Sequence, residues 1–376
     1  MQYHGGNFLG FSYQGLRGEN CLCYNPDKTI QADLRGIESV EGRLRRALDL
    51  LVGEENYQNI QVSSRTDRGV HALRNTLQVD IRPRLRQKCQ QDVKDVANDQ
   101  TSTCATEQWK PKSLVNGLNF YLFRMLRHPT LLQTSDTESE PPKKKKLSKA
   151  LPLNNNITIL SSAVAPDTMI PNQNHNPFQP EDELNPKSLP WDVRFTATRR
   201  TYAYRILHSY ADTNHTSYYH SHPFEHDRVW RIHDKNGNKG ELDIDAMNSA
   251  AKYLVGTHDF TSFRGRGCQR SSPVTTLDDI VVYKERFLGA ISGMALANET
   301  RVPDTFRLIT IVIRGKSFLY HQCRNLVACL VEVGQGRLKP NDVEKILEKK
   351  DRSYAKGMAP PQGLFLVDVE HGDFRF

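Results

Sequence analysis

The sequence predicts an α+β fold of two related mixed domains, with antiparallel-rich sheets and helices on one face. Two observations support this class. Amphipathic helical patterns and short alternating strand patterns occur in both halves of the chain, and neighbouring strand patterns pair as in β-hairpins. The length of 376 residues exceeds one ordinary domain core, which also favours two domains.

Residues 1–133 are predicted to form an N-terminal α+β domain. In ESVEGRLRRALDLLVG at 38–53, apolar side chains recur at helical spacing, with Ser39 placed to cap the helix and Gly53 to end it. Two strand patterns and one further apolar pattern follow, namely NIQVSS at 59–64, TLQVDI at 76–81 and SLVNGLNFYLFRML at 113–126.

The middle of the chain looks like two insertions. Residues 134–150 (TSDTESEPPKKKKLSKA) combine an acidic run, a Pro pair and the lysines 143–146, a composition typical of disorder. The lysine run suits a nuclear import signal, an RNA-attracting patch or a plain solvated loop. Residues 151–190 hold one strand pattern, NITILSSAV, followed from residue 165 by a loop rich in Pro and Asn.

Residues 191–376 are predicted to form a C-terminal α+β domain. Its strand patterns are RRTYAYRILHS at 199–209, LDDIVVYKE at 277–285, TFRLITIVIRGKSF at 305–318 and GLFLVDVEH at 363–371. Its helical patterns are LDIDAMNSAAKYLVG at 242–256, LYHQCRNLVACLVEVG at 319–334 and PNDVEKILEKKD at 340–351.

The composition narrows the class of partner. A formal net charge of +8 favours a polyanion, with nucleic acid ahead of a membrane surface. The seven Cys residues include no CxxC pair, which indicates reduced intracellular thiols. No secretory signal, membrane-spanning run, P-loop, GxGxxG or metal-ligand motif is present in the sequence.

The loop in NIQVSSRTDRGVHAL, residues 59–73, is the first candidate site. Asp67 follows Arg65 by two residues and precedes Gly69, a pattern that suits a turn exposing a carboxylate at a strand end. Such a carboxylate can act as nucleophile or general base. An Arg–Asp pair that merely fixes the turn is an equally good interpretation of the spacing.

Two further candidates lie in the second half. Tyr202 and Tyr204 share one face of their strand, where they either pack in the core or offer a ring to a nucleobase. Arg324 lies beside the apolar stripe of its helix and therefore needs an anionic partner. That partner is either a structural Glu or the Asp67 carboxylate.

In five segments, in order between about residue 3 and residue 371, the chain resembles the TruA family of tRNA pseudouridine synthases. SSRTDRGVHAL resembles the family's GRTDAGVHA loop, RFTATRRTYAYRI its segment with the active-site Tyr, THDFTSFRGRGCQRSSPVTTL its DFxxF block, SFLYHQCRNLVACLVEVGQG its FxxxxVRN helix, and PPQGLFLVDV its closing GLxL strand. The amino-acid sequences of these segments resemble those of the eukaryotic TruA-like branch more closely than those of bacterial members.

The resemblance implies roles for individual side chains. Asp67 would be the catalytic aspartate, paired with Arg324. Arg65 would help to hold a flipped-out nucleotide, and Tyr202 would stack on its uracil. The apolar wall of the pocket would consist of Phe318, Leu364 and Leu366. Apart from these family roles, Arg68, His71, Arg264 and Arg266 are candidate RNA contacts.

The resemblance also implies an isomerase that converts uridine to pseudouridine in tRNA, usually in the anticodon stem-loop. It implies no cofactor, often a homodimer, and two domains whose sheets join around a basic active-site cleft. A uracil within a stem or loop must be flipped out before it can react. The alternative is a non-catalytic RNA-binding protein on the same fold, but a decayed enzyme would be expected to have lost at least one of Asp67, Arg65, Tyr202 and Arg324.

Three departures from the family pattern stand out. Arg68 occupies a position that usually holds a small residue. YHGGNFLGF at 3–11 matches the family's YDGxxYxGW without the strand expected before it, which suggests a truncated start. Residues 15–38, 134–150 and 165–190 look like insertions. The lysine run favours a nuclear or cytoplasmic location, whereas a truncated start would leave an organelle open.

Overall fold

The computed structural model describes eleven stretches of the chain, which are residues 1–12, 39–85, 106–127, 157–165, 191–209, 225, 227–233, 241–285, 306–355, 357–372 and 374. The three expected insertions lie outside the described residues, apart from residue 165 itself.

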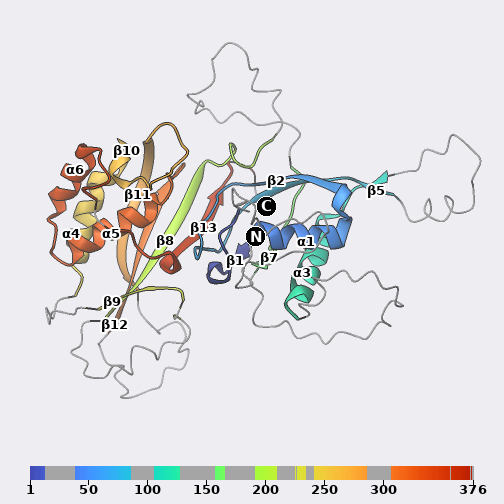
Figure 1. The fold of residues 1–376 in the computed structure, drawn as a ribbon, viewed down its shortest axis with the longest axis horizontal. Coiled ribbons are helices and arrows are strands. Elements are labelled where there is room, and N and C mark those ends of the chain that lie inside the picture. The colour runs from blue at the N-terminus through green and yellow to red at the C-terminus, as the bar shows by residue number, and fades with distance from the viewer. Residues whose placement is uncertain are drawn as a thin grey trace, which may run out of the picture.

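In the described part of the chain, one nine-stranded sheet runs through both halves (Figure 1). Its strands, in spatial order, are β10 (Gly256–Asp259), β11 (Val274–Glu285), β12 (Phe306–Gly315), β8 (Arg199–Ser209), β13 (Leu364–Glu370), β3 (His71–Ala72), β1 (Gln2–Tyr3) and β7 (Ile157–Thr158), with β9 (Trp230–His233) paired to β8. Two smaller pairs are β2 (Tyr57–Val62) with β4 (Leu77–Ile81), and β5 (Arg84–Leu85) with β6 (Thr106–Glu107).

The two halves join where the C-terminal strand meets the N-terminal ones. β13 pairs antiparallel with β8 and parallel with β3, with Leu366 opposite both Tyr202 and Ala72. Most other pairs are antiparallel. Because β3 directly follows the 63–70 loop, this pairing brings that loop to the centre of the sheet. The mixed, antiparallel-rich α+β class predicted from the sequence is confirmed.

Helices cover the sheet at both ends of the molecule (Figure 1). At one end, α4 (Ile244–Ala251) packs on α5 (Gln322–Gly334), α6 (Pro340–Lys349) and β11. β11 alternates exposed and buried side chains, so one face of the sheet lies under these helices. At the other end, α1 (Val40–Val52) packs on α3 (Pro111–Arg127).

Local signals located the elements well. Ser39 accepts a hydrogen bond from Gly42 N at the start of α1, and Gly53 ends the helix with a positive φ, as predicted. The strand expected at 156–164 is shorter: β7 has two residues, because the Asn119 side chain takes both the N–H and the C=O of Ile159. The ladder bonds that would extend the strand are thereby replaced.

The helix expected up to Gly256 also ends early. α4 stops at Ala251, a 3-10 turn covers Lys252–Leu254, and β10 begins at Gly256 with a φ of +105°. A glycine suits this left-handed corner between helix and strand. No helix in the described stretches combines the length and apolar composition needed to cross a membrane.

Candidate active site

The 63–70 loop turns its small hydroxyl side chains inward. Ser64 Oγ lies 2.7 Å from the Tyr202 hydroxyl, and Thr66 Oγ1 lies 2.8 Å from the Tyr3 hydroxyl. Both loop residues are buried, whereas Arg65 between them is exposed. Inward and outward side chains therefore alternate along the loop. Ser64 and Thr66 attach it to β8 and β1, and Arg65 faces outward.

The first segment of the chain packs tightly against the backbone of this loop. Phe11 N donates to Thr66 O at 3.1 Å, and Val70 N donates to Asp67 O at 3.1 Å. A Cβ on Gly5 would lie 2.0 Å from Val70 O, so no other residue fits there. The turn that carries Asp67 is therefore held by backbone bonds on both sides.

Asp67 directs its carboxylate to the start of α5. Asp67 Oδ2 lies 3.5 Å from Nη1 of Arg324 and 3.4 Å from Nε2 of His321. The Arg324 side chain is 8% exposed and that of Asp67 is 24% exposed, so the pair lies at the border between core and solvent. The anionic partner that Arg324 needed is Asp67 rather than a structural Glu.

Arg324 is held from a second side. Its Nε donates to Ala359 O at 2.7 Å, and Ala359 N donates back to Arg324 O at 3.1 Å. This exchange ties the first turn of α5 to the segment just before β13. Arg324 is thus oriented before any ligand arrives, which limits the reorganisation that a reaction at Asp67 would require.

Tyr202 is a residue of β8 and lies next to the loop that carries Asp67. Its ring meets Phe318 edge-on at a centroid distance of 5.1 Å, and Leu366 lies opposite it on β13. Leu364 lies opposite Tyr204 and is buried like Leu366. Burial raises the pKa of Tyr202 far above its ordinary value, so its hydroxyl stays protonated at neutral pH.

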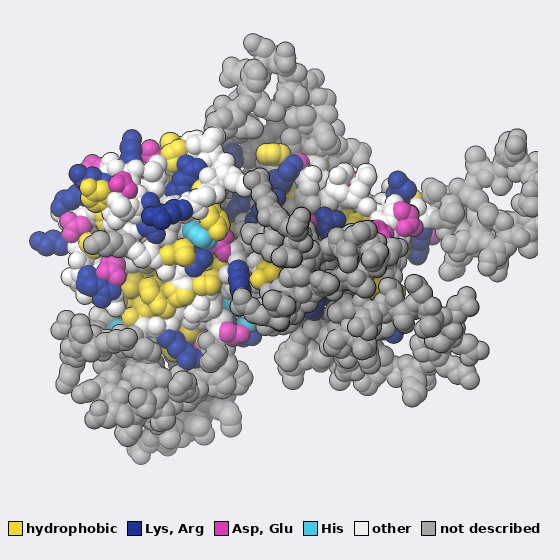
Figure 2. Space-filling view, viewed as in Figure 1, with side chains coloured by type: hydrophobic (Ala, Val, Ile, Leu, Met, Phe, Trp, Pro, Cys, Tyr) yellow, Lys and Arg dark blue, Asp and Glu magenta, His cyan; other side chains and the backbone are white. Residues whose placement is uncertain are grey.

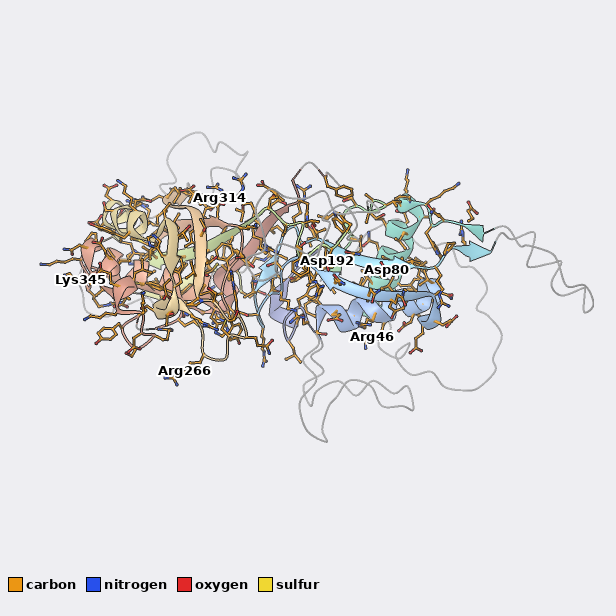
Figure 3. The ribbon with its side chains drawn as sticks, turned by 90° about the horizontal axis from the view of Figure 1, so that it is seen from above. Arg46, Asp80, Asp192, Arg266, Arg314 and Lys345 are labelled. Carbon is orange, nitrogen blue, oxygen red and sulfur yellow. The ribbon has the colours of Figure 1, made fainter. Side chains whose placement is uncertain are left out.

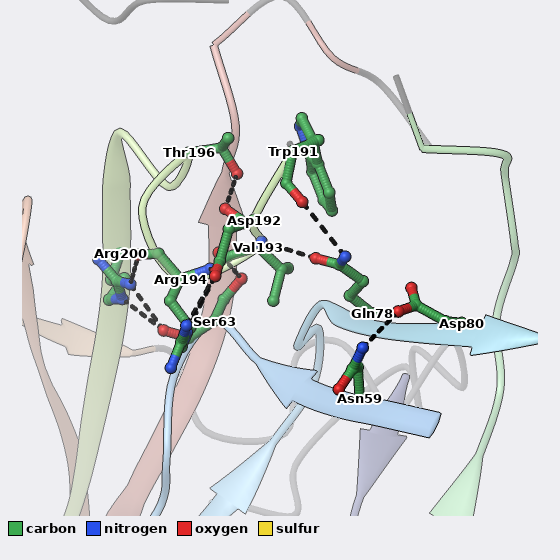
Figure 4. Close-up of polar contacts among 10 residues, drawn as sticks. All are labelled: Asn59, Ser63, Gln78, Asp80, Trp191, Asp192, Val193, Arg194, Thr196 and Arg200. Carbon is green, nitrogen blue, oxygen red and sulfur yellow. Dashed lines mark hydrogen bonds and ion pairs between the residues drawn. The ribbon is translucent and has the colours of Figure 1, made fainter. Parts of the chain in front are cut away.

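Arg200, two residues before Tyr202, braces the same loop (Figure 4). Its Nε and Nη2 donate to Ser63 O, at 3.3 and 2.6 Å, and its Nη1 donates to Lys316 O. Ser63 Oγ in turn donates to Val193 O at 2.9 Å. The Arg200 guanidinium therefore joins the 63–70 loop to the segment that carries Phe318.

The three arginines among the candidate RNA contacts differ in exposure. Arg68 and Arg266 are exposed, and Figure 3 shows Arg266 pointing away from the ribbon. Arg264 instead turns inward and donates to Cys268 O and Arg270 O. Figure 2 shows further Lys and Arg side chains spread over the visible face of the molecule.

His71 corrects one expectation. It is 1% exposed, its Nδ1 accepts from Gly5 N, and its Nε2 lies 3.1 Å from both Asp227 O and Gln362 O. Because the ring is buried and both of its nitrogens bond inside the protein, His71 is not exposed for the RNA contact that was expected. Burial lowers its pKa to about 4, which keeps the ring neutral.

Three residues of the site, Ser64, Arg200 and His321, were not predicted from the sequence. The i, i+3 spacing of His321 and Arg324 was a usable signal, since such residues lie on one side of a helical turn. Ser64 and Arg200 had no comparable signal, because their partners come from distant segments. No three His, Cys, Asp or Glu side chains gather as metal ligands among the described residues.

Comparisons with known proteins point to one family. A family model described as tRNA pseudouridine synthase matches residues 250–371. A tRNA pseudouridine synthase A of Parvibaculum lavamentivorans is 36% identical over 211 residues, covering 55% of this chain and 72% of the relative. Those of Caulobacter vibrioides and Xanthobacter autotrophicus are 28% and 29% identical over 337 and 342 residues. They cover 90% and 91% of this chain, and 91% and 92% of the relatives.

These relatives are bacterial, so the closer likeness to the eukaryotic branch stays a prediction.

Proposed function

Because the chain belongs to the TruA family of tRNA pseudouridine synthases, we propose that it isomerises uridine to pseudouridine in tRNA. One observation carries the proposal beyond family membership. The Asp67 carboxylate lies against the buried guanidinium of Arg324, and its loop bonds to the Tyr202 hydroxyl through Ser64. A fixed carboxylate on a loop that is bonded to an aromatic residue suits chemistry on a flipped-out nucleoside.

The reaction moves the uracil without adding or removing atoms. The N1–C1′ bond breaks, the C5–C1′ bond forms, and the proton on C5 is lost while N1 gains one. Asp67 serves this exchange in one of two ways: it adds to C1′, or it takes the C2′ proton to give a glycal. Both ways require an oriented carboxylate, which the contact with Arg324 supports.

The neighbouring residues take supporting roles in this proposal. Tyr202 stacks on the uracil, and Arg65 holds the nucleotide outside its helix. Phe318 and Leu366 supply apolar surface close to Tyr202, and Leu364 continues it opposite Tyr204 on the same pair of strands. The exposed guanidinium groups of Arg68 and Arg266, together with Arg264, contribute positive charge for phosphates.

Finer parts of the proposal concern substrate and assembly. The anticodon stem-loop is the proposed target, the active form is a homodimer without a cofactor, and the protein acts in the nucleus or cytoplasm. Residues 1–133 and 191–376 are proposed as the two domains. The net charge of +8 supports an RNA substrate, and the β13–β3 pairing supports a joint between two such domains.

Pseudouridine mapping of tRNA tests the proposal. Total tRNA that lacks pseudouridine is incubated with the purified full chain, and pseudouridine is located by chemical labelling and sequencing. New pseudouridine at anticodon stem-loop positions is the expected result. Binding of tRNA without any conversion would instead identify a non-catalytic RNA-binding protein.

A further inference from the structure

We propose that His321 is a positioning residue of this site, which donates Nε2–H to Asp67 Oδ2 and thereby leaves Oδ1 to react with the ribose. The inference rests on the proposed function and adds two assignments to it. One is a role for His321, and the other is the identity of the reacting oxygen.

The contacts of the carboxylate are one-sided. His321 Nε2 at 3.4 Å and Arg324 Nη1 at 3.5 Å both approach Oδ2 of Asp67. Among the described residues, no hydrogen bond or ion pair reaches Oδ1. Two donors on one oxygen fix the plane of the carboxylate and leave the other oxygen for a substrate.

The backbone of His321 is held in an unusual conformation. Its φ is +60° and its ψ is 5°, in the left-handed region that side chains with a Cβ rarely adopt. Its ring stacks on Tyr320 at a centroid distance of 3.7 Å. Strained residues of this kind cluster at functional sites, where the surroundings hold them in place.

Gly265 provides those surroundings. Gly265 N donates to Tyr320 O at 2.7 Å, and a Cβ on Gly265 would lie 2.8 Å from that oxygen and 3.0 Å from the Cβ of His321. The absence of a side chain at Gly265 therefore lets its loop pack against the turn. This packing directs the imidazole toward Asp67 and not toward solvent, since the His321 side chain is only 19% exposed.

The charges around His321 favour a neutral imidazole. The groups that face it are Asp67 from the 63–70 loop, Arg324 on α5 and Arg352 after α6, with Tyr320 stacked beside it. Burial lowers the pKa of His321 below its ordinary value, and both arginines lower it further, whereas Asp67 raises it. The lowered pKa of His321 therefore favours an uncharged imidazole beside Asp67.

A neutral His321 suits either reaction route. If Oδ1 adds to C1′, the carboxylate donates an electron pair while the N1–C1′ pair leaves with the uracil. If Oδ1 takes the C2′ proton, the C2′–H pair forms the glycal double bond while the same N1–C1′ pair leaves. Either way negative charge moves from Asp67 to uracil. A protonated His321 would hold that charge on Oδ2 and weaken Oδ1 as nucleophile or base.

Two variants of the full chain separate the donor from the ring. His321→Phe keeps an aromatic ring for Tyr320 but has no N–H for Asp67. His321→Gln supplies an amide N–H at a similar reach but cannot titrate. We expect kcat to fall about 10- to 100-fold in His321→Phe, with the KM for tRNA unchanged, because a hydrogen bond to a charged group is lost.

The pH profile gives the second readout. In the wild type, kcat should fall as the pH falls through the pKa of His321, and His321→Gln should retain most activity while losing this dependence. Lys350→Gly serves as the control for a substitution at a residue with a left-handed backbone. Lys350 has a φ of +49° but lies at the end of α6, outside the proposed site. Wild-type kcat in His321→Phe, or an unchanged pH profile in His321→Gln, would overturn the inference.

A measurement without turnover keeps the two proposals distinguishable. The pKa of His321 is followed by NMR of ¹³C-labelled histidine in the wild type and in Asp67→Asn, with His321→Gln assigning the signal. Loss of the Asp67 charge should lower the pKa of His321 further, since that carboxylate raises it. An unchanged pKa refutes the contact, whereas failure to convert any tRNA refutes the proposed function instead.

Discussion

Replacing Arg324 by Met removes the guanidinium from the first turn of α5 and keeps a flexible apolar side chain in its place. Two interactions end with it. Ala359 O loses a donor at 2.7 Å, and Asp67 Oδ2 loses its partner at 3.5 Å. The variant therefore tests whether one side chain both stabilises the fold and orients the carboxylate.

The structure sets the expected magnitudes. A hydrogen bond from a charged donor contributes about 1.5–3 kcal/mol, and the bond to Ala359 O is short and buried. The pair with Asp67 is longer, and Asp67 is 24% exposed, so it adds less than about 1 kcal/mol. The free energy of unfolding should fall by about 2–4 kcal/mol. The loss of a preorganised charge should lower kcat by about 10²–10³-fold.

The assay pairs urea denaturation with single-turnover conversion of tRNA. Arg205→Met is the matched control, since Arg205 forms a half-buried pair with Glu225 at 2.6 Å elsewhere on β8. This control should lose stability but keep kcat. The reasoning is refuted if Arg324→Met turns over like the wild type, or if Arg205→Met loses as much activity as Arg324→Met.

Three further outcomes are expected. Tyr202→Phe breaks the 2.7 Å contact with Ser64 but keeps the ring, so stability should fall by about 1 kcal/mol in thermal melts, and kcat should fall less than in Tyr202→Leu. The pKa of His71 is lowered from 6.5 to about 4. The free energy of unfolding of the wild type should therefore fall by about 3 kcal/mol as the pH falls from 6.5 to about 4. His71→Gln should be less stable at pH 7 yet show a flatter pH dependence in urea titrations. Arg200→Lys cannot reproduce the forked bond to Ser63 O, so kcat should fall about tenfold while the affinity for tRNA, measured by filter binding, stays the same.

The elements that the sequence predicted well are those with local causes. α1 begins after Ser39 and ends before Gly53, and both residues form the cap hydrogen bonds at its ends. The alternating pattern RRTYAYRILHS covers the full length of β8. The resemblance also implied the pairing of Asp67 with Arg324, which the structure contains. For α1 and β8 the deciding residues lie within one element, whereas the Asp67–Arg324 pair joins two motifs that the resemblance places in one site.

The misses have long-range causes. His71 was a candidate RNA contact, but Gly5, Asp227 and Gln362 from three other segments bond to its ring. His321 was overlooked because its left-handed φ and its approach to Asp67 depend on the packing of Gly265. Apart from the i, i+3 spacing of His321 and Arg324, no periodicity or spacing in the sequence records such contacts.

Asp67→Asn separates the reaction of the carboxylate from the binding of tRNA. The substitution keeps the size of the side chain and removes its charge, and Asp80→Asn is the control, since Asp80 is exposed and accepts from Asn59 Nδ2 at 2.7 Å. Conversion of uridine to pseudouridine is measured in purified tRNA alongside the Kd for that tRNA. The prediction is no detectable pseudouridine from Asp67→Asn with a Kd close to that of the wild type, and normal conversion by Asp80→Asn. Pseudouridine formed by Asp67→Asn at the wild-type rate would contradict the assignment of Asp67 as the reacting carboxylate.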